Sequence, residues 1–317
     1  MKILIYILKK LCSACVTLLI ISLLTFLVFQ ILPGNPVDII LGVDADPLQA
    51  DALKKELGLN LPLWQQYFHW VSGLLHGNLG NSLRYHLPVG SMILRCLPVT
   101  VSLTILSLLI TVIIVVPLSV YLAKNNNKRI PALISSITQL GLAIPSFWLA
   151  IMLILLFAVI LKWFPSGNFV QFSDSVFGAV RSLILPSVSI SIGTTAVIIR
   201  YLKNTLLDQM NMDYVRTARS KGLSRNAVLY KHVLKNALLP TITILGMIAV
   251  DVLGGSIIIE NVFNLPGIGS LITSGVGNRD FPLVQGLVFY LALTVVVINF
   301  VVDILYTIVD PRIRLEE

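Results

Sequence analysis

Five long stretches without any charged residue constrain the fold of this chain more than any other feature. They lie between Lys10 and Asp38, Arg95 and Lys124, Arg129 and Lys162, Arg181 and Arg200, and Asp280 and Asp303. A helix needs roughly 17–25 apolar residues to cross the hydrocarbon core of a bilayer, and each stretch has about that length or more. Only 12% of all residues are charged, whereas a soluble domain carries about 25%. The sequence therefore predicts an integral membrane protein.

A sixth apolar stretch, about residues 236–259, is interrupted by a single acid, Asp251. We therefore expect an all-α fold with six transmembrane helices, because a helix satisfies its own backbone hydrogen bonds where lipid cannot. The expected spans are residues 9–31, 98–123, 131–161, 182–203, 235–259 and 284–308. Pro117, Pro145 and Pro240 lie in or beside these spans and are expected to kink them.

Lysine and arginine gather on one side of the six spans, and this sets the expected orientation. They precede the first span, fill the second and fourth connections, and follow the last span. Cytoplasmic connections carry such an excess, so both termini are expected in the cytoplasm. The net charge of +8 then reflects topology and attraction to anionic membrane lipid, and no nucleic acid is needed to explain it.

The connection after the first span, about residues 32–97, is long and is expected outside the cytoplasm. Asp46-Pro47 is expected to begin one short helix, and a second begins near Pro62. Five side chains of the second helix are expected on one face: Trp64, Tyr67, Phe68, Val71 and Leu75. This face either lies at the membrane surface or packs over the ends of the spans. The two interpretations are compatible, and we favour packing.

The connection between the fourth and fifth spans, residues 204–234, carries the clearest functional pattern. Residues 213–222 read Asp-Tyr-Val-Arg-Thr-Ala-Arg-Ser-Lys-Gly. Gly222 is expected to end a helix in the left-handed conformation, and Ser224 to cap a second helix. Ala218, four residues before Gly222, is expected to leave a low face that another protein can approach closely. The alternative is a solvated basic loop held by lipid headgroups.

This segment resembles the cytoplasmic loop of importer permeases in the ATP-binding-cassette (ABC) superfamily, which carries Glu-Ala-Ala, three residues and then Gly. Ala218 and Gly222 match the last Ala and the Gly. Arg216 and Thr217 replace the Glu and the first Ala, and Lys235 stands where the general pattern ends in proline. These departures are typical of the dipeptide, oligopeptide and nickel branch. That branch favours Tyr-Val-Arg-Thr-Ala-x-x-Lys-Gly-Leu, which residues 214–223 match.

Further segments along almost the whole chain resemble the same branch. They are residues 32–36, 56–59, 62–67, 77–82, 95–100, 260–263, 266–269, 278–282 and 310–314. The chain looks like the first of two related permeases, the one with the long first outer loop. The resemblance implies a type I ABC importer permease architecture in the bacterial cytoplasmic (inner) membrane.

The resemblance also implies a division of labour among subunits. The expected partners are a second related permease, two ABC ATPases, an extracytoplasmic solute-binding protein and membrane lipid. The residues expected to contact an ATPase are Tyr214, Arg216, Ala218, Lys221, Gly222 and Leu223. ATP and Mg would bind the ATPases, since this chain has no Gly-x-x-x-x-Gly-Lys-Ser/Thr phosphate loop. No cofactor, metal site or catalytic group is expected in this chain.

The expected organisation has four parts. Residues 1–31 form the cytoplasmic N-terminus and the first span, and residues 32–97 form the outer loop with short helices. Residues 98–310 form a five-helix permease core that includes the cytoplasmic coupling loop, and residues 311–317 form a cytoplasmic tail.

Asp251, Gly254 and Gly255 in the fifth span are the candidates for a translocation path. A carboxylate inside a membrane span is expected to face water or a partner, because lipid cannot solvate it. Asp251 either pairs with Arg200 or with a group of the second permease, or lines the path and meets a cationic group of the substrate.

The substrate expected from the resemblance is a dipeptide or an oligopeptide, with nickel or a metal chelate as the alternative. A more distant alternative is an ion-coupled secondary transporter, which usually has inverted repeats that are not evident here. That alternative would also leave the cytoplasmic loop unexplained. An intramembrane enzyme would need paired polar groups, and Asp251 and Asp303 are the only acids within the expected spans.

Overall fold

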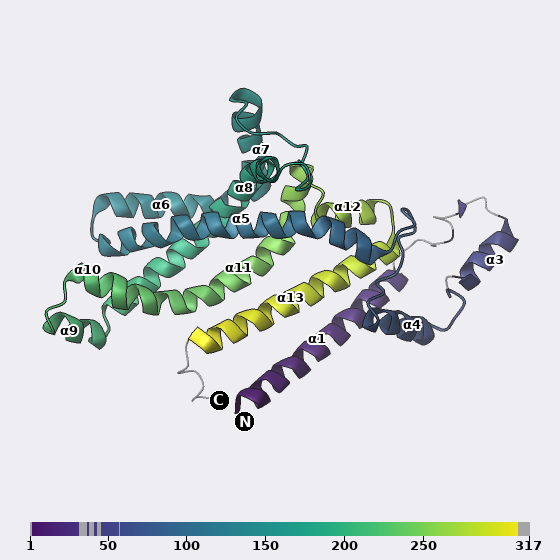
Figure 1. Cartoon of the computed structure of the whole chain (residues 1–317), viewed down its shortest axis with the longest axis horizontal. Helices are drawn as coiled ribbons and strands as arrows, with labels where there is room; N and C mark the ends of the chain where they lie inside the picture. The colour runs from purple at the N-terminus through teal and green to yellow at the C-terminus, as the bar shows by residue number, and fades with distance from the viewer. Residues whose placement is uncertain (1, 32–36, 38–40, 43–45, 57, 310–317) are drawn as a thin grey trace. The chain divides into compact units, whose positions relative to one another are not determined.

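The computed structural model describes residues 2–31, 37, 41–42, 46–56 and 58–309. These residues are almost entirely helical, as Figure 1 shows. Within this part of the chain, β-pairing is confined to an isolated bridge between Asn81 and Pro88. The all-α prediction is therefore confirmed.

Among the described residues, five helices are long and apolar enough to cross a membrane. They are α1 (Lys2–Ile31), α5 (Val89–Lys124), α8 (Val176–Met210), α11 (Leu234–Val262) and α13 (Phe281–Val309). Each contains one expected span and extends beyond at least one end of it. The helices are longer than the expected spans because residues next to each apolar run continue the helix.

The expected third span, residues 131–161, is not one helix. α6 (Arg129–Ala143) and the helix that begins with α7 (Ser146–Leu153) meet at an angle of 100°. The break lies at Pro145, because the proline ring disfavours a helical conformation of the residue before it. Ile144 accordingly has φ −87° and ψ 120°. The prediction of a single kinked helix is wrong here, and the pair is either a broken span or a re-entrant loop.

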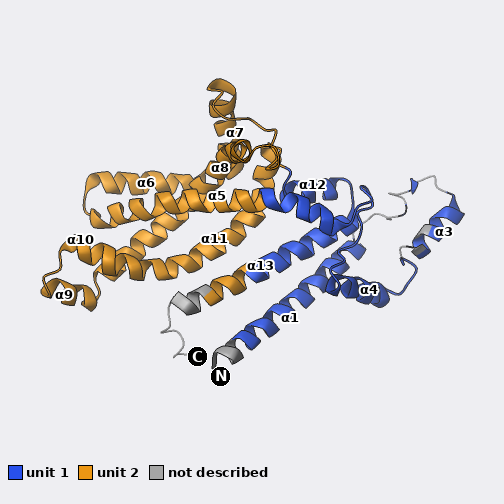
Figure 2. Cartoon of the chain, viewed as in Figure 1, with its two compact units in different colours: residues 1–99, 266–297 blue, residues 100–265, 298–317 orange. Residues whose placement is uncertain are grey.

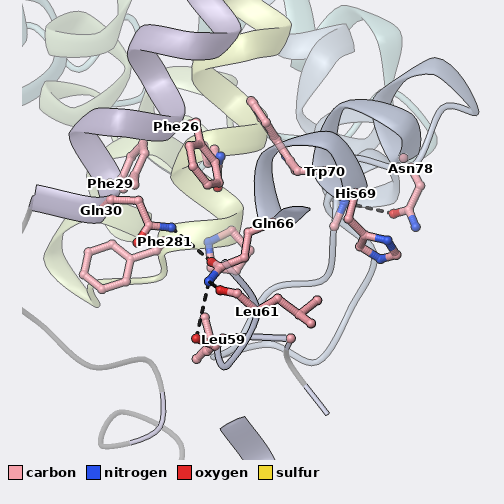
Figure 3. A pocket seen from close by; sticks show the side chains of 15 residues that line it. Phe26, Phe29, Gln30, Leu59, Leu61, Gln66, His69, Trp70, Asn78 and Phe281 are labelled. Carbon is pink, nitrogen blue, oxygen red and sulfur yellow. Dashed lines mark hydrogen bonds between the residues drawn. The ribbon is translucent and has the colours of Figure 1, made fainter. Parts of the chain in front are cut away.

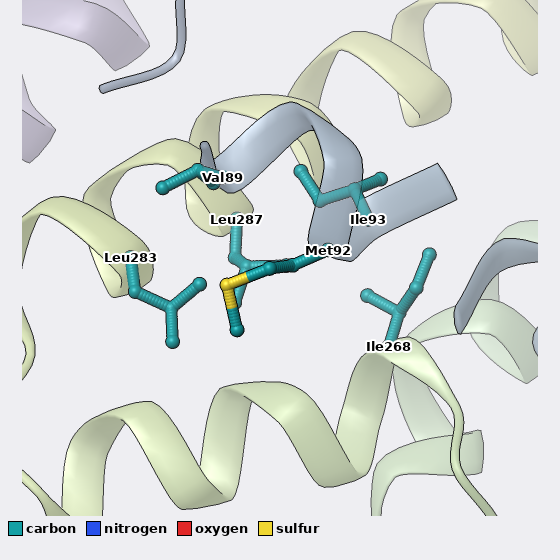
Figure 4. Packing of buried hydrophobic residues seen from close by; sticks show 6 residues of the cluster. All are labelled: Val89, Met92, Ile93, Ile268, Leu283 and Leu287. Carbon is teal, nitrogen blue, oxygen red and sulfur yellow. The ribbon is translucent and has the colours of Figure 1, made fainter. Parts of the chain in front are cut away.

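The chain divides into two compact units, which Figure 2 distinguishes by colour. Unit 1 comprises residues 1–99 and 266–297. It holds α1, the start of α5, most of α13, and the short helices α3 (Pro47–Glu56), α4 (Leu63–Leu75) and α12 (Ile268–Gly277). A buried apolar cluster joins α5, α12 and α13 (Figure 4): Val89, Met92, Ile93, Ile268, Leu283 and Leu287. This cluster fixes the start of α5 against the start of α13.

A cavity of about 400 Å³ lies in unit 1 beside α1, α4 and the start of α13. Aromatic rings and side-chain amides line it (Figure 3), among them Phe26, Gln30, Gln66, Trp70 and Phe281. The Gln66 side chain accepts a hydrogen bond from Gln30 Nε2 at 3.2 Å and donates one to the Leu61 carbonyl at 2.8 Å. The amide pair thus ties α4 to the end of α1.

Unit 2 comprises residues 100–265 and 298–317 and is built around α8, which packs against α6, α7 and α11. α7 is extended by a π-helix, η1 (Ile154–Ile160). Several aliphatic side chains of α8 are completely or almost completely buried: Leu183, Ile198, Ile199, Leu202 and Leu206. Gly246 lets α11 approach α13 closely, because a Cβ at that position would overlap the side chain of Val302.

Candidate coupling loop and translocation path

The expected coupling loop folds as an ordered helical hairpin. α9 (Asp213–Ser220) follows the end of α8 and packs on α10 (Arg225–Val228). α10 continues without interruption through a second π-helix, η2 (Leu229–Val233), into α11. The π-helix was not anticipated from the sequence.

The turn after α9 is a Schellman motif. Gly222 has φ +80°, so its predicted left-handed conformation is confirmed. Its N–H donates to the Arg219 carbonyl at 2.9 Å, and the Leu223 N–H donates to the Ala218 carbonyl at 3.3 Å. These two hydrogen bonds satisfy carbonyls that a helix end otherwise leaves unpaired. The spacing Ala-x-x-x-Gly-Leu therefore has a local cause in how the helix ends.

Two further side chains fix the ends of the hairpin. The Ser224 hydroxyl oxygen accepts a hydrogen bond from the Ala227 N–H at 3.3 Å, which confirms the predicted cap of the second helix. The Tyr214 hydroxyl donates to Gln209 Oε1 at 2.8 Å and ties α9 to the last turn of α8.

Ala218 faces its own chain, so the expectation that it leaves a low face open to another protein is wrong. Its side chain is 8% exposed, and that of Val215 is 1% exposed. The two residues lie three positions apart, which places them on one side of α9. A larger side chain at Ala218 would therefore disturb the support of α9 before it met another protein.

The accessible surface of the hairpin includes Arg216, Lys221, Gly222 and Leu223, all of which are exposed. A Cβ added at Gly222 would meet no atom within 4 Å. Arg216 forms an ion pair with Asp213 at 3.5 Å, but both side chains are at least 80% exposed, so the pair adds little stability. Of the expected contact residues, these four are available to a partner, whereas Tyr214 and Ala218 support them from within the chain.

Asp251 lies on a side of α11 that the rest of the described chain leaves uncovered. Met247, Asp251, Gly254 and Ile258 are all exposed and recur every three or four residues, which places them on one helix face. Within the described residues Asp251 forms no ion pair, so the alternative in which it pairs with Arg200 is not seen here.

Gly254 and Gly255 follow Asp251 inside α11. A Cβ at Gly254 would meet no atom within 4 Å, so the helix is narrow and unobstructed there. Insertion of a carboxylate at the centre of a membrane helix costs about 2.5–3.5 kcal/mol on insertion scales. This cost argues against contact between this face and lipid. Water or a polar partner is therefore needed beside Asp251.

Glu260 is a buried acid that was not among the predicted site residues. It has no exposed surface and lies near the end of α11. Its Oε1 accepts hydrogen bonds from the Thr100 hydroxyl at 2.8 Å and the Ser256 hydroxyl at 3.2 Å. Because Thr100 belongs to α5, the carboxylate joins α5 to α11. The available sequence signal was an acid directly after the apolar residues 257–259.

Asp280 is a second buried acid that was not among the predicted site residues. It precedes α13 and accepts a hydrogen bond from the N–H of Leu283, in the first turn of that helix, at 3.3 Å. It also accepts hydrogen bonds from the Ser82 hydroxyl and from the N–H groups of Leu83 and Arg84. One carboxylate thus caps α13 and holds the segment that precedes α5.

Comparison with known protein families finds matches over nearly the whole chain. The family described as "Binding-protein-dependent transport system inner membrane component" matches residues 115–315. The family that describes the N-terminal part of such membrane components matches residues 3–104. The first match includes the coupling loop and the uncovered face of α11.

Individual relatives match the chain from end to end. A Brucella abortus (strain 2308) protein named as a peptide transport system permease is 41% identical over 308 residues, which are 97% of this chain and 98% of the relative. The oligopeptide transport system permease AppB of Bacillus subtilis (strain 168) is 36% identical over 312 residues, 98% of this chain and 99% of AppB.

A solved structure shares the fold. An inward-facing form of the MetNI methionine ABC transporter matches with a TM-score of 0.58 and 19% identity, over 69% of this chain and 96% of the matched chain. At this level of identity the likeness concerns the fold alone. The predicted type I importer permease fold is confirmed.

Proposed function

Because the chain belongs to the family of binding-protein-dependent transport system inner membrane components, as its sequence patterns predicted, we propose that it forms half of the translocation pathway of an ATP-driven peptide importer. The observation that carries this proposal is the end-to-end match to relatives named as peptide and oligopeptide permeases. These relatives favour a peptide over nickel or a metal chelate, the alternative that the sequence left open. Membership of this family also argues against an ion-coupled secondary transporter.

The turn at Gly222 is the proposed contact with an ATPase. Arg216, Lys221 and Leu223 are accessible beside it, and its backbone is held by the Schellman motif. A projection that is already ordered loses little conformational entropy when it enters a cleft on a partner. Two ABC ATPases would bind ATP and Mg, one against this chain and one against a second, related permease.

The uncovered face of α11 is the proposed translocation path. Asp251 needs water or a polar partner at membrane depth, and Gly254 and Gly255 keep the helix narrow beside it. A carboxylate on an aqueous path would attract the ammonium group of a peptide. A polar group of the second permease is the competing partner for Asp251.

The proposed orientation places both termini and the coupling loop in the cytoplasm and residues 32–97 on the opposite side of the bacterial cytoplasmic membrane. It rests on the distribution of lysine and arginine among the connections. A solute-binding protein outside the cytoplasm would then deliver the substrate to the outer ends of the spans.

Uptake by whole cells tests the substrate assignment. Cells that lack this chain, and the same cells with the gene restored, would receive a radiolabelled peptide and, in parallel, radioactive nickel. We expect that peptide uptake is lost without the chain and returns with it, whereas nickel uptake does not change. The opposite result would overturn the peptide assignment and leave the family membership intact.

A further inference from the structure

Helix α4 carries an apolar face that no part of the described chain covers. Trp64, Phe68 and Leu75 are 61%, 63% and 83% exposed. They lie four and seven residues apart, so they share one side of the helix. The sequence pattern grouped Tyr67 with them, but in the structure the Tyr67 ring packs against α1 instead.

The other side of α4 is held against two long helices. The Tyr67 hydroxyl oxygen lies 2.9 Å from the Ser22 hydroxyl oxygen of α1, and the Tyr67 ring packs on Phe26 with centroids 5.4 Å apart. Trp70 stacks on Phe26 at 6.3 Å and meets the Phe289 ring of α13 at 6.1 Å. Figure 3 shows Phe26 and Trp70 at this contact. The position of α4 along α1 and α13 is therefore fixed by packing.

The contacts with α1 set the depth of α4 in a membrane. Ser22 lies nine residues before the end of α1 at Ile31, or about 13 Å along the helix axis. The apolar span Ile7–Ile31 has 25 residues, so it is about 37 Å long and exceeds a roughly 30 Å hydrocarbon core by about 7 Å. Even if all of this excess projects at the Ile31 end, Ser22 lies about 6 Å inside the core. Phe26 then falls near the boundary of the hydrocarbon core.

The contact with α13 gives a similar depth from a second span. Phe289 lies eight residues after the start of α13 at Phe281, or about 12 Å along the axis. The composition of α4 agrees with this position, because its 13 residues include no Asp, Glu, Lys or Arg. The neighbouring helix α3 has four such residues among ten.

We infer that α4 lies in the membrane–water interface and that the face formed by Trp64, Phe68 and Leu75 binds lipid. The inference requires only that α1 and α13 span the membrane, and it does not depend on which substrate is transported. Lipid fits this face better than a protein partner does, because the face is uncharged and lies at the boundary of the acyl chains. Tryptophan favours this zone, since its ring is apolar and its N–H reaches the headgroups. Bound in this way, α4 anchors the end of α1 and sets its depth.

Site-specific photocrosslinking in the assembled transporter tests the inference. Benzoylphenylalanine would be placed at position 68 and, as the matched control, at position 48 in α3. Phe68 and Leu48 are similarly exposed, at 63% and 79%, but only Leu48 lies on a charged helix. After irradiation of intact membranes, mass spectrometry of this chain would detect any lipid adduct. We expect the adduct at position 68 and not at position 48, with or without the binding protein.

Three crosslinking results would overturn the inference. A crosslink from position 68 to the binding protein or to another subunit, in place of lipid, would make the face a protein-docking surface. No adduct at position 68 would place the face in water, and equal lipid adducts at both positions would remove the distinction between α4 and α3.

Introducing one aspartate into α4 or into α3, and measuring the amount of chain in the membrane, tests the inference independently. A Phe68→Asp variant should reduce the amount of chain recovered from the membrane, because a carboxylate on this face opposes contact with acyl chains. The matched Leu48→Asp variant should not. Equal recovery of the two variants contradicts the inference.

Discussion

Removal of the Asp280 carboxylate should release the segment before α5 from the start of α13. One carboxylate oxygen accepts hydrogen bonds from the Ser82 hydroxyl at 2.5 Å and from the Arg84 N–H at 3.2 Å. The other oxygen accepts from the N–H groups of Leu83 at 3.1 Å and Leu283 at 3.3 Å. In an Asp280→Ala variant, all four donors lose their acceptor at once.

The buried donors decide the magnitude of this effect. Ser82 and Leu283 are 2% and 0% exposed, whereas Arg84 is exposed and its N–H can turn to water. A buried donor without an acceptor costs about 1–3 kcal/mol, so the two together cost about 2–6 kcal/mol. A loss of about 3 kcal/mol raises the population of the open segment by roughly a hundredfold.

Amide hydrogen exchange on the transporter in lipid nanodiscs measures this opening directly. We expect exchange at residues 83–84 and 283 to be roughly a hundredfold faster in Asp280→Ala, since exchange follows local opening. The Asp280→Asn variant keeps the shape and one acceptor oxygen, so its exchange should increase less. Exchange in α8 serves as the internal control for global unfolding. Unchanged protection at these amides in a folded Asp280→Ala variant would refute the role assigned to the carboxylate.

Substitutions at four other positions give further testable expectations. Gly222→Trp should abolish transport and reduce co-purification of the ATPases, whereas Gly222→Asn, which tolerates the left-handed conformation, should retain both; normal transport by the tryptophan variant contradicts the proposed contact. A cysteine in place of Gln49, after replacement of the three native cysteines, should react with an impermeant thiol reagent in intact cells, and labelling only after lysis would reverse the orientation. Glu260→Leu removes the acceptor of the Thr100 hydroxyl, whereas the Ser256 hydroxyl can still donate to the Leu253 carbonyl; the variant should lower the melting temperature of the transporter more than Glu260→Gln, and equal melting temperatures count against this. Asp251→Asn should assemble but take up peptide more slowly, and an unchanged uptake rate for every peptide tested would rule out a pore charge.

The positions of the spans could be predicted from the charge-free stretches, because lipid leaves a spanning segment few alternatives to a helix. The size of the break at Pro145 could not. Pro117, Pro186 and Pro240 also lie in long helices, yet α5, α8 and α11 continue through them. A proline removes one hydrogen bond and disfavours a helical residue before it, but packing decides whether the helix ends. α6 and α7 each pack on α8, and these contacts stabilise them as two separate helices.

At the coupling loop, the backbone could be predicted but the direction of one side chain was missed. Gly222 and Ser224 act at helix ends, where preferences are local and readable from sequence. Ala218 belongs with Val215, three residues earlier, and both stand among polar neighbours. That apolar pair indicated an inward face of α9. The prediction rested instead on the small size of Ala218 and its spacing from Gly222.

The burial of Glu260 and Asp280 could not be predicted from the sequence. A charged residue beside an apolar run usually marks the end of a span, and both residues fit that reading. Their hydroxyl donors, Thr100 and Ser82, lie 160 and 198 residues away along the chain. Such partners become visible only when the fold brings their helices and loops together.

The coupling loop and Asp251 are connected by one continuous helix, which has a mechanical consequence for the proposed function. α10, η2 and α11 run without interruption from Arg225 to Val262. Asp251 lies 22 residues after Leu229, the first residue of η2, or about 33 Å along the axis. Because α9 packs on α10 at the start of this helix, a force that displaces α9 reaches Asp251 without crossing a loop. Between Arg225 and Val262 the helix departs from α-geometry only at η2, so a bend there would change the angle between the coupling loop and the span that carries Asp251.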